Sequence, residues 1–345
     1  MIKTKCKAIF SEKGKFEDFE IERRKLKSND VLIKIKYAGI CHSDIHSARN
    51  EWGGAKYPMV PGHEIAGEII KVGNKVKNFK IGDLAGVGCM VNSCQNCDAC
   101  NQGYEQECLK SVFTYNSLDH FNDNEWTYGG YSDLIVVDEK FVIKVPNNAP
   151  LEYVAPLLCA GITTYSPIKF SKIKKGDKVA IAGFGGLGSM AVKYAKHFGA
   201  DIYVFARNKR KEKEAINLGA IKLYDSLNNV EEKFDLIIST IPTNYNVLDY
   251  VRLLKIGGEM AILGLPPVGT KWNFDPGGLI FNGHRKIYGS LIGGIKSTQE
   301  MLDFSLKNKI YPEIEIISPN QIDEAYEKLT TGQAKFRYVI DMSKL

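Results

Sequence analysis

The chain has 345 residues, of which 44% are hydrophobic and 25% are charged. These values are those of an ordinary globular protein and exclude a fibrous or disordered chain. The length exceeds what one hydrophobic core usually serves, so we expect two domains. The formal charge of +6 is too diffuse to indicate nucleic-acid binding.

The sequence contains no run of 18 apolar residues, and charged residues stand near the N-terminus where a secretory signal has its apolar core. We therefore expect a cytoplasmic protein that does not bind membranes. Cytosolic thiols stay reduced, so the clusters among the eight cysteines indicate metal binding or catalysis rather than disulfides.

The first part of the chain has a β pattern. From about residue 5 to 145, short runs of β-forming residues are interrupted by Gly, Asn, Asp and Pro. This spacing predicts a compact, mostly β domain over residues 1–150. A longer apolar helical pattern then begins in "PNNAPLEYVAPLLCAGITTYSPI", which places the boundary near residue 150.

Apolar strands alternate with helical segments after this boundary. Strands are predicted at 178–184, 200–206, 234–240 and 259–265, with helices ending near 198 and 218 and another over 245–254. Such strands form a parallel sheet covered on both faces. We therefore predict an α/β fold, with a doubly wound domain over 151–288. The pattern alone assigns the last strand, in "KFRYVIDMS", to neither domain.

The motif "GFGGLG" follows the first of these strands and precedes a helical segment. It supplies Gly183, Gly185 and Gly188, with Gly186 and Leu187 between them. Glycines at such a turn let backbone N–H groups and the helix N-terminus approach a pyrophosphate. The placement of the motif predicts a dinucleotide site.

The end of the second strand bears on which dinucleotide binds. A site for NAD usually places Asp or Glu about 20 residues beyond the glycines, against the ribose 2′-hydroxyl. Here the chain has no acid, but Arg207, Asn208, Arg210 and Lys211. Guanidinium groups match phosphate oxygens in bidentate geometry. The sequence therefore favours NADP over NAD, the alternative being an exposed basic helix start.

Four cysteines lie close together in "CQNCDACNQGYEQEC": Cys94, Cys97, Cys100 and Cys108. Four thiolates at this spacing can close a tetrahedral zinc shell with no open position, which predicts a structural zinc lobe over 94–108. An iron–sulfur cluster is the less favoured alternative.

Further ligand types lie far apart in the sequence. Cys41 stands in "GICHSDIH", His63 and Glu64 in "PGHE", and Cys159 in "LLCAGIT". Two thiolates and one imidazole form a known shell for catalytic zinc, whose fourth position takes water or substrate. Spacing alone does not select these residues from the six histidines and eight cysteines.

Motifs along nearly the whole chain resemble one family. "GICHSDIH", "PMVPGHEIAGEI", the four-cysteine lobe, "GGYS", "LLCAGITTYSP" and "GFGGLG" occur in the order found in zinc-dependent medium-chain alcohol dehydrogenases. Within them, the chain looks most like the cinnamyl alcohol dehydrogenase group. The resemblance implies a mostly β, GroES-like catalytic domain, completed by residues 289–345, and a Rossmann cofactor domain. It also implies two zinc ions per subunit, an active site in the cleft between the domains, and a homodimer.

The resemblance also implies roles for the scattered ligands. Cys41, His63 and Cys159 would bind the catalytic zinc, with Glu64 beside it as an alternative ligand. Asp44 would orient His63 through its other ring nitrogen.

Ser43 and His46 match the proton relay of the family. Oxidising an alcohol by hydride transfer requires loss of its hydroxyl proton, which a zinc ion makes far easier. Ser43 would accept this proton and pass it, through the nicotinamide ribose, to His46. Cys6 and Cys89 fall outside the ligand motifs, and we expect both to be buried packing residues.

The reaction expected from the resemblance is hydride transfer between NADP(H) and aliphatic or aromatic primary alcohols or aldehydes. Substrate-pocket candidates, by position in the family pattern, are Trp52, Tyr57, Met90 and Tyr115. The segment "SLDHFNDNEWTY" departs from the family pattern, which argues against a plant lignin-precursor specificity. Alternatives are an NAD(P)-dependent polyol dehydrogenase, a zinc-free quinone or enone reductase, and a nonenzymatic zinc-lobe protein that binds nucleic acid.

Overall fold

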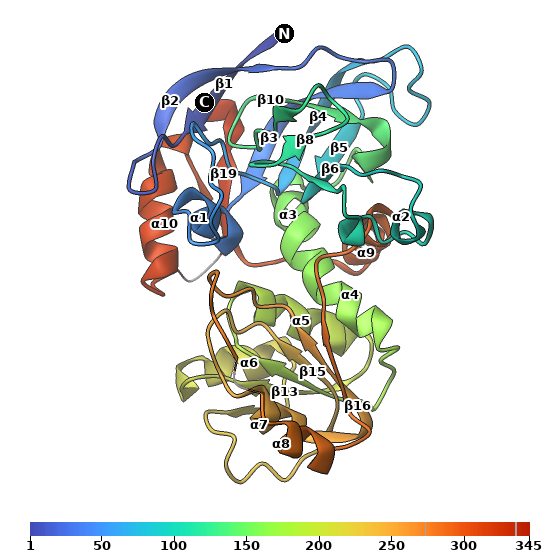
Figure 1. Ribbon diagram of the computed structural model, residues 1–345, viewed down its shortest axis with the longest axis vertical. Coiled ribbons are helices and arrows are strands. Elements are labelled where there is room, and N and C mark those ends of the chain that lie inside the picture. The colour runs from blue at the N-terminus through green and yellow to red at the C-terminus, as the bar shows by residue number, and fades with distance from the viewer. Residues whose placement is uncertain (273, 335–336) are drawn as a thin grey trace. The chain divides into compact units, whose positions relative to one another are not determined.

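The computed structural model describes residues 1–272, 274–334 and 337–345. The chain forms two compact units, one of residues 1–162 and 293–345, the other of residues 163–292 (Figure 1). The sequence placed the limits at 150/151 and 288/289. The first unit extends further because α3 (Leu151–Pro156) packs on the sheet of that unit and the π-helical turn η3 (Leu157–Gly161) packs on α9 (Ile295–Asn308).

The first unit is built on a seven-stranded sheet in the order β11-β5-β4-β3-β19-β18, with β10 also paired to β3. Its strands are β3 (Asp30–Gly39), β4 (Ile65–Val72), β5 (Leu84–Val87), β10 (Leu134–Asp138), β11 (Ile143–Val145), β18 (Ile314–Ile317) and β19 (Arg337–Asp341). All pairs except β18–β19 are antiparallel. Because β19 pairs with β3, the last strand belongs to this unit.

Short elements surround this sheet. Three two-stranded ribbons consist of β1 (Ile2–Ala8) with β2 (Glu17–Arg23), β6 (Met90–Asn92) with β7 (Val112–Phe113), and β8 (Leu118–Asp119) with β9 (Glu125–Trp126). The remaining helices are α1 (His42–Ala48), α2 (Asp98–Asn101), α10 (Ile322–Thr330) and the 3₁₀ turns η1 (Glu105–Glu107), η2 (Glu139–Phe141), η5 (Pro319–Gln321) and η6 (Met342–Lys344). The prediction of a mostly β N-terminal region is confirmed.

The second unit contains a parallel sheet in the order β14-β13-β12-β15-β16-β17. Its strands are β12 (Lys178–Ala182), β13 (Asp201–Phe205), β14 (Lys222–Tyr224), β15 (Phe234–Ser239), β16 (Leu254–Ile262) and β17 (Lys286–Gly289). Its helices are α4 (Ile162–Phe170), α5 (Gly186–His197), η4 (Lys209–Lys211), α6 (Glu212–Leu218), α7 (Val247–Val251) and α8 (Pro276–Phe281). The predicted doubly wound α/β fold is confirmed.

The strand order of this sheet reverses between β12 and β15, and ligands of such sheets bind beyond the carboxyl ends of the strands at this point. One core cluster of the unit is aromatic, with Phe205, Phe234 and Tyr250 packed together. The sequence missed β14 and β17, which are short strands.

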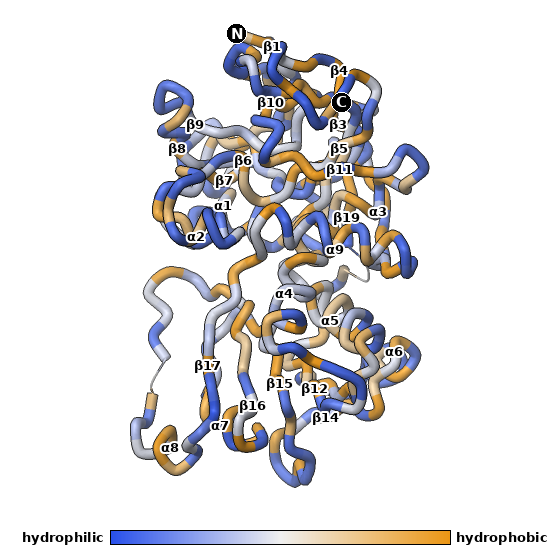
Figure 2. The backbone as a smooth tube through the Cα atoms, turned by 90° about the vertical axis from the view of Figure 1, so that its right-hand side faces the viewer, coloured by the Kyte–Doolittle hydropathy of each residue, from blue (hydrophilic) through white to orange (hydrophobic). Residues whose placement is uncertain are grey.

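Hydrophobic residues are distributed over both units rather than concentrated in one long stretch (Figure 2). Within the described residues, no helix combines the length and the apolar character needed to cross a membrane.

Candidate metal centres and cofactor site

One cluster of potential metal ligands contains Cys41, His63, Glu64 and Cys159. One ligand atom from each lies within 4.8 Å of the ligand atoms of the others. Cys41 precedes α1, the adjacent His63 and Glu64 precede β4, and Cys159 lies in η3. A π-helical turn is rare and is frequently found at functional sites. The structure therefore brings together the three predicted ligands and the predicted neighbour, all within the first unit.

Asp44 connects the segments of this cluster through hydrogen bonds. Its carboxylate is fully buried and accepts hydrogen bonds from the backbone N–H groups of Cys41, at 2.8 Å, and Gly62, at 3.0 Å. The first of these bonds belongs to a capping box at the start of α1. The same carboxylate lies 3.0 Å from Nδ1 of His63. Asp44 thus fixes the positions of the segments that carry Cys41 and His63. Because Asp44 binds Nδ1 of His63, Nε2 of this ring points to the cluster.

The predicted ligands contact each other. Nε2 of His63 lies 3.2 Å from Sγ of Cys159. Hydrogen bonding to Cys159 holds the pKa of the Cys41 thiol well below its usual value, against the effect of burial. The same bond, with a further one to Cys89, raises the pKa of Cys159. The side chains of the predicted ligands are therefore already in contact in the folded chain.

Glu64 is the fourth member and is fully buried. Burial raises the pKa of its carboxyl to about 7, although the charge of Arg337 opposes the shift. Arg337, on β19, forms an ion pair with Oε1 of Glu64, whereas Oε2 is buried without a hydrogen-bond partner among the described residues. A Cβ at Gly39 would lie 2.0 Å from Oε2, so the close approach of Glu64 requires glycine there. Sequence reasoning missed Arg337, since a cation in a strand gives no sign of its partner.

This donor set fits zinc. Two thiols and an imidazole with a hydrogen-bonded second nitrogen are the chemistry of a catalytic zinc shell. The buried, unpartnered oxygen of Glu64 is a further potential ligand in the same space.

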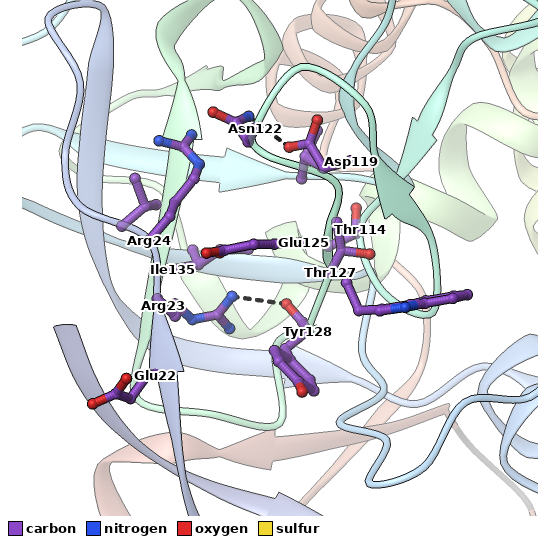
Figure 3. A pocket seen from close by; sticks show the side chains of 13 residues that line it. Glu22, Arg23, Arg24, Thr114, Asp119, Asn122, Glu125, Thr127, Tyr128 and Ile135 are labelled. Carbon is purple, nitrogen blue, oxygen red and sulfur yellow. Dashed lines mark hydrogen bonds between the residues drawn. The ribbon is translucent and has the colours of Figure 1, made fainter. Parts of the chain in front are cut away.

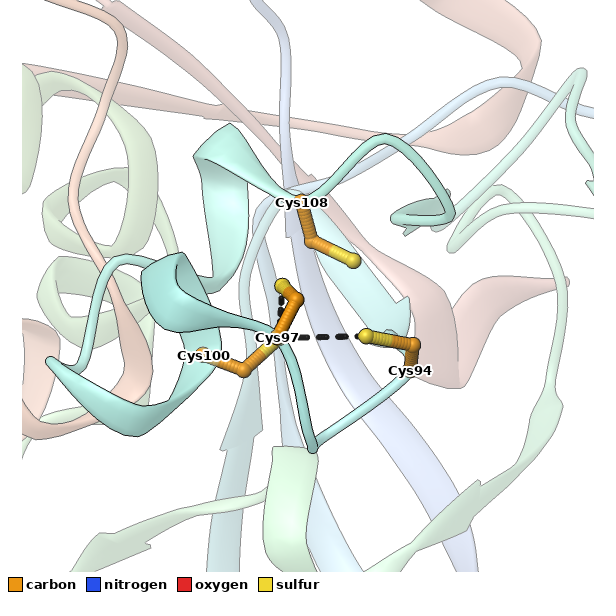
Figure 4. A group of neighbouring side chains, drawn as sticks. All are labelled: Cys94, Cys97, Cys100 and Cys108. Carbon is orange, nitrogen blue, oxygen red and sulfur yellow. Dashed lines mark hydrogen bonds between the residues drawn. The ribbon is translucent and has the colours of Figure 1, made fainter.

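The second cluster consists of four thiols, from Cys94, Cys97, Cys100 and Cys108, whose sulfur atoms lie within 4.8 Å of one another (Figure 4). Cys97 caps the short helix α2 and Cys108 ends η1, so tight turns present the sulfur atoms to a common centre. The backbone N–H of Lys110 donates to Sγ of Cys108 at 3.3 Å. Four thiols without a carboxylate or imidazole fit a closed, tetrahedral zinc site. No disulfide links the cysteines of the described chain.

The glycine motif lies at the strand reversal of the second unit. Gly183 follows β12 with φ of 94°, a left-handed conformation that favours glycine. A Cβ at Gly188 would lie 2.1 Å from the carbonyl oxygen of Gly183, so α5 packs closely against the turn. Gly185 precedes α5, and Gly186 and Leu187 form its first turn. This is the arrangement expected of a pyrophosphate-binding turn.

The basic run follows β13, the strand next to β12. Arg207, Asn208, Arg210 and Lys211 are all exposed there. Oδ1 of Asn208 accepts hydrogen bonds from the backbone N of Arg210, at 3.1 Å, and from its Nε, at 3.3 Å. The ion pairs of the described residues do not include Arg207 or Arg210, so both guanidinium groups are available to an anion.

The predicted relay residues lie on or next to α1. Oγ of Ser43 lies 3.6 Å from Sγ of Cys41. Nδ1 of His46 is paired with Glu51, a partner that the sequence did not predict. The hydrogen bonds of the described residues do not join Ser43 to His46.

Two of the four substrate-pocket candidates lie close to these residues. The ring of Trp52 is 5.0 Å from that of His46, and the ring of Tyr115 is 5.9 Å from that of His63. The Tyr115 hydroxyl donates to the backbone of Ser43 at 3.1 Å.

The other two candidates are held by the fold. The Tyr57 hydroxyl donates to the carbonyl of Ala48 at 2.7 Å, and Met90 is buried. Their roles in substrate binding stay predictions.

The segment that departs from the family pattern forms the β8–β9 ribbon. It lines a pocket together with Arg23, Arg24 and Thr114 (Figure 3). Buried Arg23 donates to the carbonyls of Tyr128 and Gly129, each at 2.8 Å. The four substrate-pocket candidates do not line this pocket.

The two cysteines expected to pack in the core differ. Cys6 is buried, as predicted. The prediction for Cys89 is wrong, since its side chain is partly exposed and its thiol is hydrogen-bonded to Cys159.

Two family models match the chain. "Alcohol dehydrogenase GroES-like domain" matches residues 27–147 and "Zinc-binding dehydrogenase" matches residues 186–307. Among curated proteins, the probable formaldehyde dehydrogenase AdhA of Bacillus subtilis is 45% identical, with 99% of this chain and 98% of that protein covered. The chain belongs to the zinc-dependent medium-chain alcohol dehydrogenases.

Other relatives support this assignment of the dehydrogenase. NADP-dependent alcohol dehydrogenase C 1 of Mycolicibacterium smegmatis is 46% identical over 94% of each chain. The crystal structure of CAD from Helicobacter pylori, complexed with NADP(H), is 58% identical, with a TM-score of 0.96 and 99% of each chain covered. The family resemblance and the fold predicted from the sequence are therefore confirmed.

Proposed function

We propose that this dehydrogenase transfers hydride between NADP(H) and primary alcohols or aldehydes, with one catalytic and one structural zinc ion per chain. The observation that carries the proposal is the buried cluster in which Asp44 holds the segments of Cys41 and His63 beside Cys159. A zinc-free reductase of the same superfamily has no need of this donor set.

Cys41, His63 and Cys159 would hold the catalytic zinc. Zinc at this position supplies Lewis-acid chemistry, which polarises the oxygen of an alcohol or aldehyde. Asp44 fixes the tautomer and ring plane of His63 through Nδ1. Glu64 would serve as an alternative zinc ligand. When its carboxylate does not bind the zinc, the ion pair with Arg337 would hold it in place.

The proton of the substrate hydroxyl would pass through residues of α1. Oγ of Ser43, beside Cys41, would accept it, and the ring of His46 would exchange it with solvent. Glu51 holds Nδ1 of His46, which leaves Nε2 for the exchange. In aldehyde reduction the same groups deliver the proton in the opposite direction.

The cofactor assignment is supported by the exposed cations after β13. Gly183, Gly185 and Gly188 would accept the pyrophosphate, and Arg207 and Arg210, steadied by Asn208, would hold the 2′-phosphate. Relatives named as NADP-dependent, and the CAD structure with NADP(H), agree with this choice. The bound cofactor supplies the hydride.

We also propose that the enzyme is a cytoplasmic homodimer. The helix α8, which precedes the edge strand β17 in the chain, exposes Phe281 at 93% and Ile280 at 76%, and a second copy would cover these apolar side chains. Light scattering at micromolar concentration tests the dimer.

One assay tests the proposed function. Butanal, benzaldehyde and sorbitol are each offered with NADP(H) and with NAD(H), before and after treatment with a zinc chelator. We expect aldehyde reduction with NADPH, little turnover of sorbitol, and loss of activity on chelation. An Arg207→Ala variant should raise KM for NADPH about ten- to a hundredfold and leave KM for NADH unchanged, because charge-assisted hydrogen bonds contribute about 1.5–3 kcal/mol. Faster turnover with NADH, or full activity after zinc removal, contradicts the proposal.

A further inference from the structure

Cys89 is a thiol that the proposed reaction does not use, although it lies beside the proposed zinc site. It stands between β5 and β6, is partly exposed, and is hydrogen-bonded through its thiol to Cys159. Neither the four-thiol lobe nor the buried donor set includes it.

The backbone brings the two cysteines together. A Cβ at Gly88 would lie 3.0 Å from the carbonyl oxygen of Leu158, and a Cβ at Gly86 would lie 2.6 Å from the Leu158 side chain. The residues that precede Cys89 therefore pack directly on the residue that precedes Cys159. Both segments belong to the first unit, so the contact does not depend on the position of the second unit.

We propose that Cys89 and Cys159 form a redox pair in which a hydroperoxide converts the two thiols into a disulfide and thereby releases the catalytic zinc. This inference rests on the proposed function, because Cys159 matters as a ligand only if the buried cluster binds zinc. Cytosolic disulfides are usually transient and redox-sensing, which suits a pair of this kind.

The chemistry balances in two steps. The Cys89 thiol attacks hydrogen peroxide, which gives a sulfenic acid and one molecule of water. The sulfur of Cys159 then attacks the sulfenic sulfur and forms the S–S bond, and the expelled hydroxide takes up the proton of the Cys159 thiol to become the second water molecule. The two sulfurs lose two electrons in total, and the peroxide gains them.

Oxidation removes one of the two thiolate ligands. Cys41 and His63 would remain, with Glu64 tied to Arg337, and a site with fewer ligands binds zinc less tightly. A thiol reductant followed by zinc would reverse the change. Cys89 is the partner for Cys159 because, unlike Cys41, it is not engaged in holding the metal.

The test treats the zinc-loaded enzyme with hydrogen peroxide and follows zinc release with a chromogenic chelator, disulfides by mass spectrometry of unreduced peptides, and aldehyde reduction. Wild type, Cys89→Ser and Cys6→Ser are compared, each against its own untreated sample. Cys6→Ser is the matched control, since Cys6 is the other cysteine outside both clusters.

We expect wild type and Cys6→Ser to lose one zinc ion per chain together with activity, to yield a Cys89–Cys159 peptide, and to recover with dithiothreitol and zinc. Cys89→Ser should keep that zinc and its activity under the same treatment. Equal zinc loss in Cys89→Ser, a disulfide between Cys41 and Cys159, or oxidation confined to the four-thiol lobe overturns the proposal. Absence of zinc from the buried site in untreated protein would instead refute the proposed function.

Discussion

The first unit contains two clusters of potential metal ligands, which share thiols and differ in their other members. The lobe offers four thiols and no other ligand type, from a segment of 15 residues whose turns present them to one centre. The buried cluster mixes two thiols, an imidazole and a carboxylate from three separate segments of the chain, which contain Cys41, the pair His63 and Glu64, and Cys159. A closed set of four thiolates is typical of a structural zinc site, which stabilises the fold. A mixed set of three ligands, oriented by a buried carboxylate, is typical of a catalytic zinc site with one position open to a substrate.

The largest effect on turnover is expected from Cys41→Ala. A metal contributes several kcal/mol of transition-state stabilisation and each 1.4 kcal/mol is tenfold, so kcat/KM should fall about a thousandfold or more. Metal analysis should find one zinc ion per chain instead of two, with an unfolding temperature close to that of wild type. If the variant retained both zinc ions and its activity, the buried cluster would not be the reaction centre.

Ser43→Ala separates proton transfer from metal binding within the same cluster. A positioned proton-transfer group contributes about a hundredfold or more, so kcat should fall by that factor while both zinc ions remain. Turnover and zinc content measured on one preparation check this. Unchanged kcat would mean that the hydroxyl of Ser43 carries no proton.

Asp44→Asn tests the orienting carboxylate, which has no counterpart in the lobe. Partners of metal-bound histidines typically contribute ten- to a hundredfold in affinity or activity, so we expect a loss of about that size. Zinc competition against a chelator of known affinity measures it at the buried site. Equal weakening of zinc at both sites would argue that Asp44 acts on the whole fold.

Cys97→Ala should have the smallest effect on chemistry and a large one on stability. Losing a structural metal is among the changes that lower the free energy of unfolding by about 4 kcal/mol or more. Thermal unfolding should begin at a lower temperature than in wild type, while turnover per folded molecule stays near that of wild type. A fall in kcat as large as that of Cys41→Ala would remove the distinction between the clusters.

The sequence predicted the doubly wound domain well because its strands are apolar throughout and its glycine turn has a strict steric origin. Gly183 adopts a left-handed conformation and Gly188 has no room for a side chain. Both positions therefore require glycine, and the motif can be recognised in the sequence. The contacts of the fold divide the chain after residue 162 rather than near residue 150, because a helical pattern does not show which sheet the helix packs on.

The buried cluster was predicted through family resemblance rather than spacing, since its members meet only in the folded chain. Arg337 and Glu51 were missed for the same reason: each is an ordinary charged residue until tertiary structure supplies its partner. Cys89 was misjudged because a thiol next to apolar residues looks like a packing residue, and its contact with Cys159 depends on two glycines packing against Leu158.

Replacement of zinc by cobalt(II) tests the central distinction most directly, because the visible spectrum of cobalt reports changes in its ligands. An alcohol substrate or a small azole is added to the enzyme in which cobalt has replaced both zinc ions. The spectrum of one cobalt ion should shift, and this shift should disappear in His63→Ala. The spectrum of the lobe cobalt should stay constant in both proteins. A spectrum that does not respond to any small ligand, or a response that persists in His63→Ala, would contradict an open catalytic site in the buried cluster.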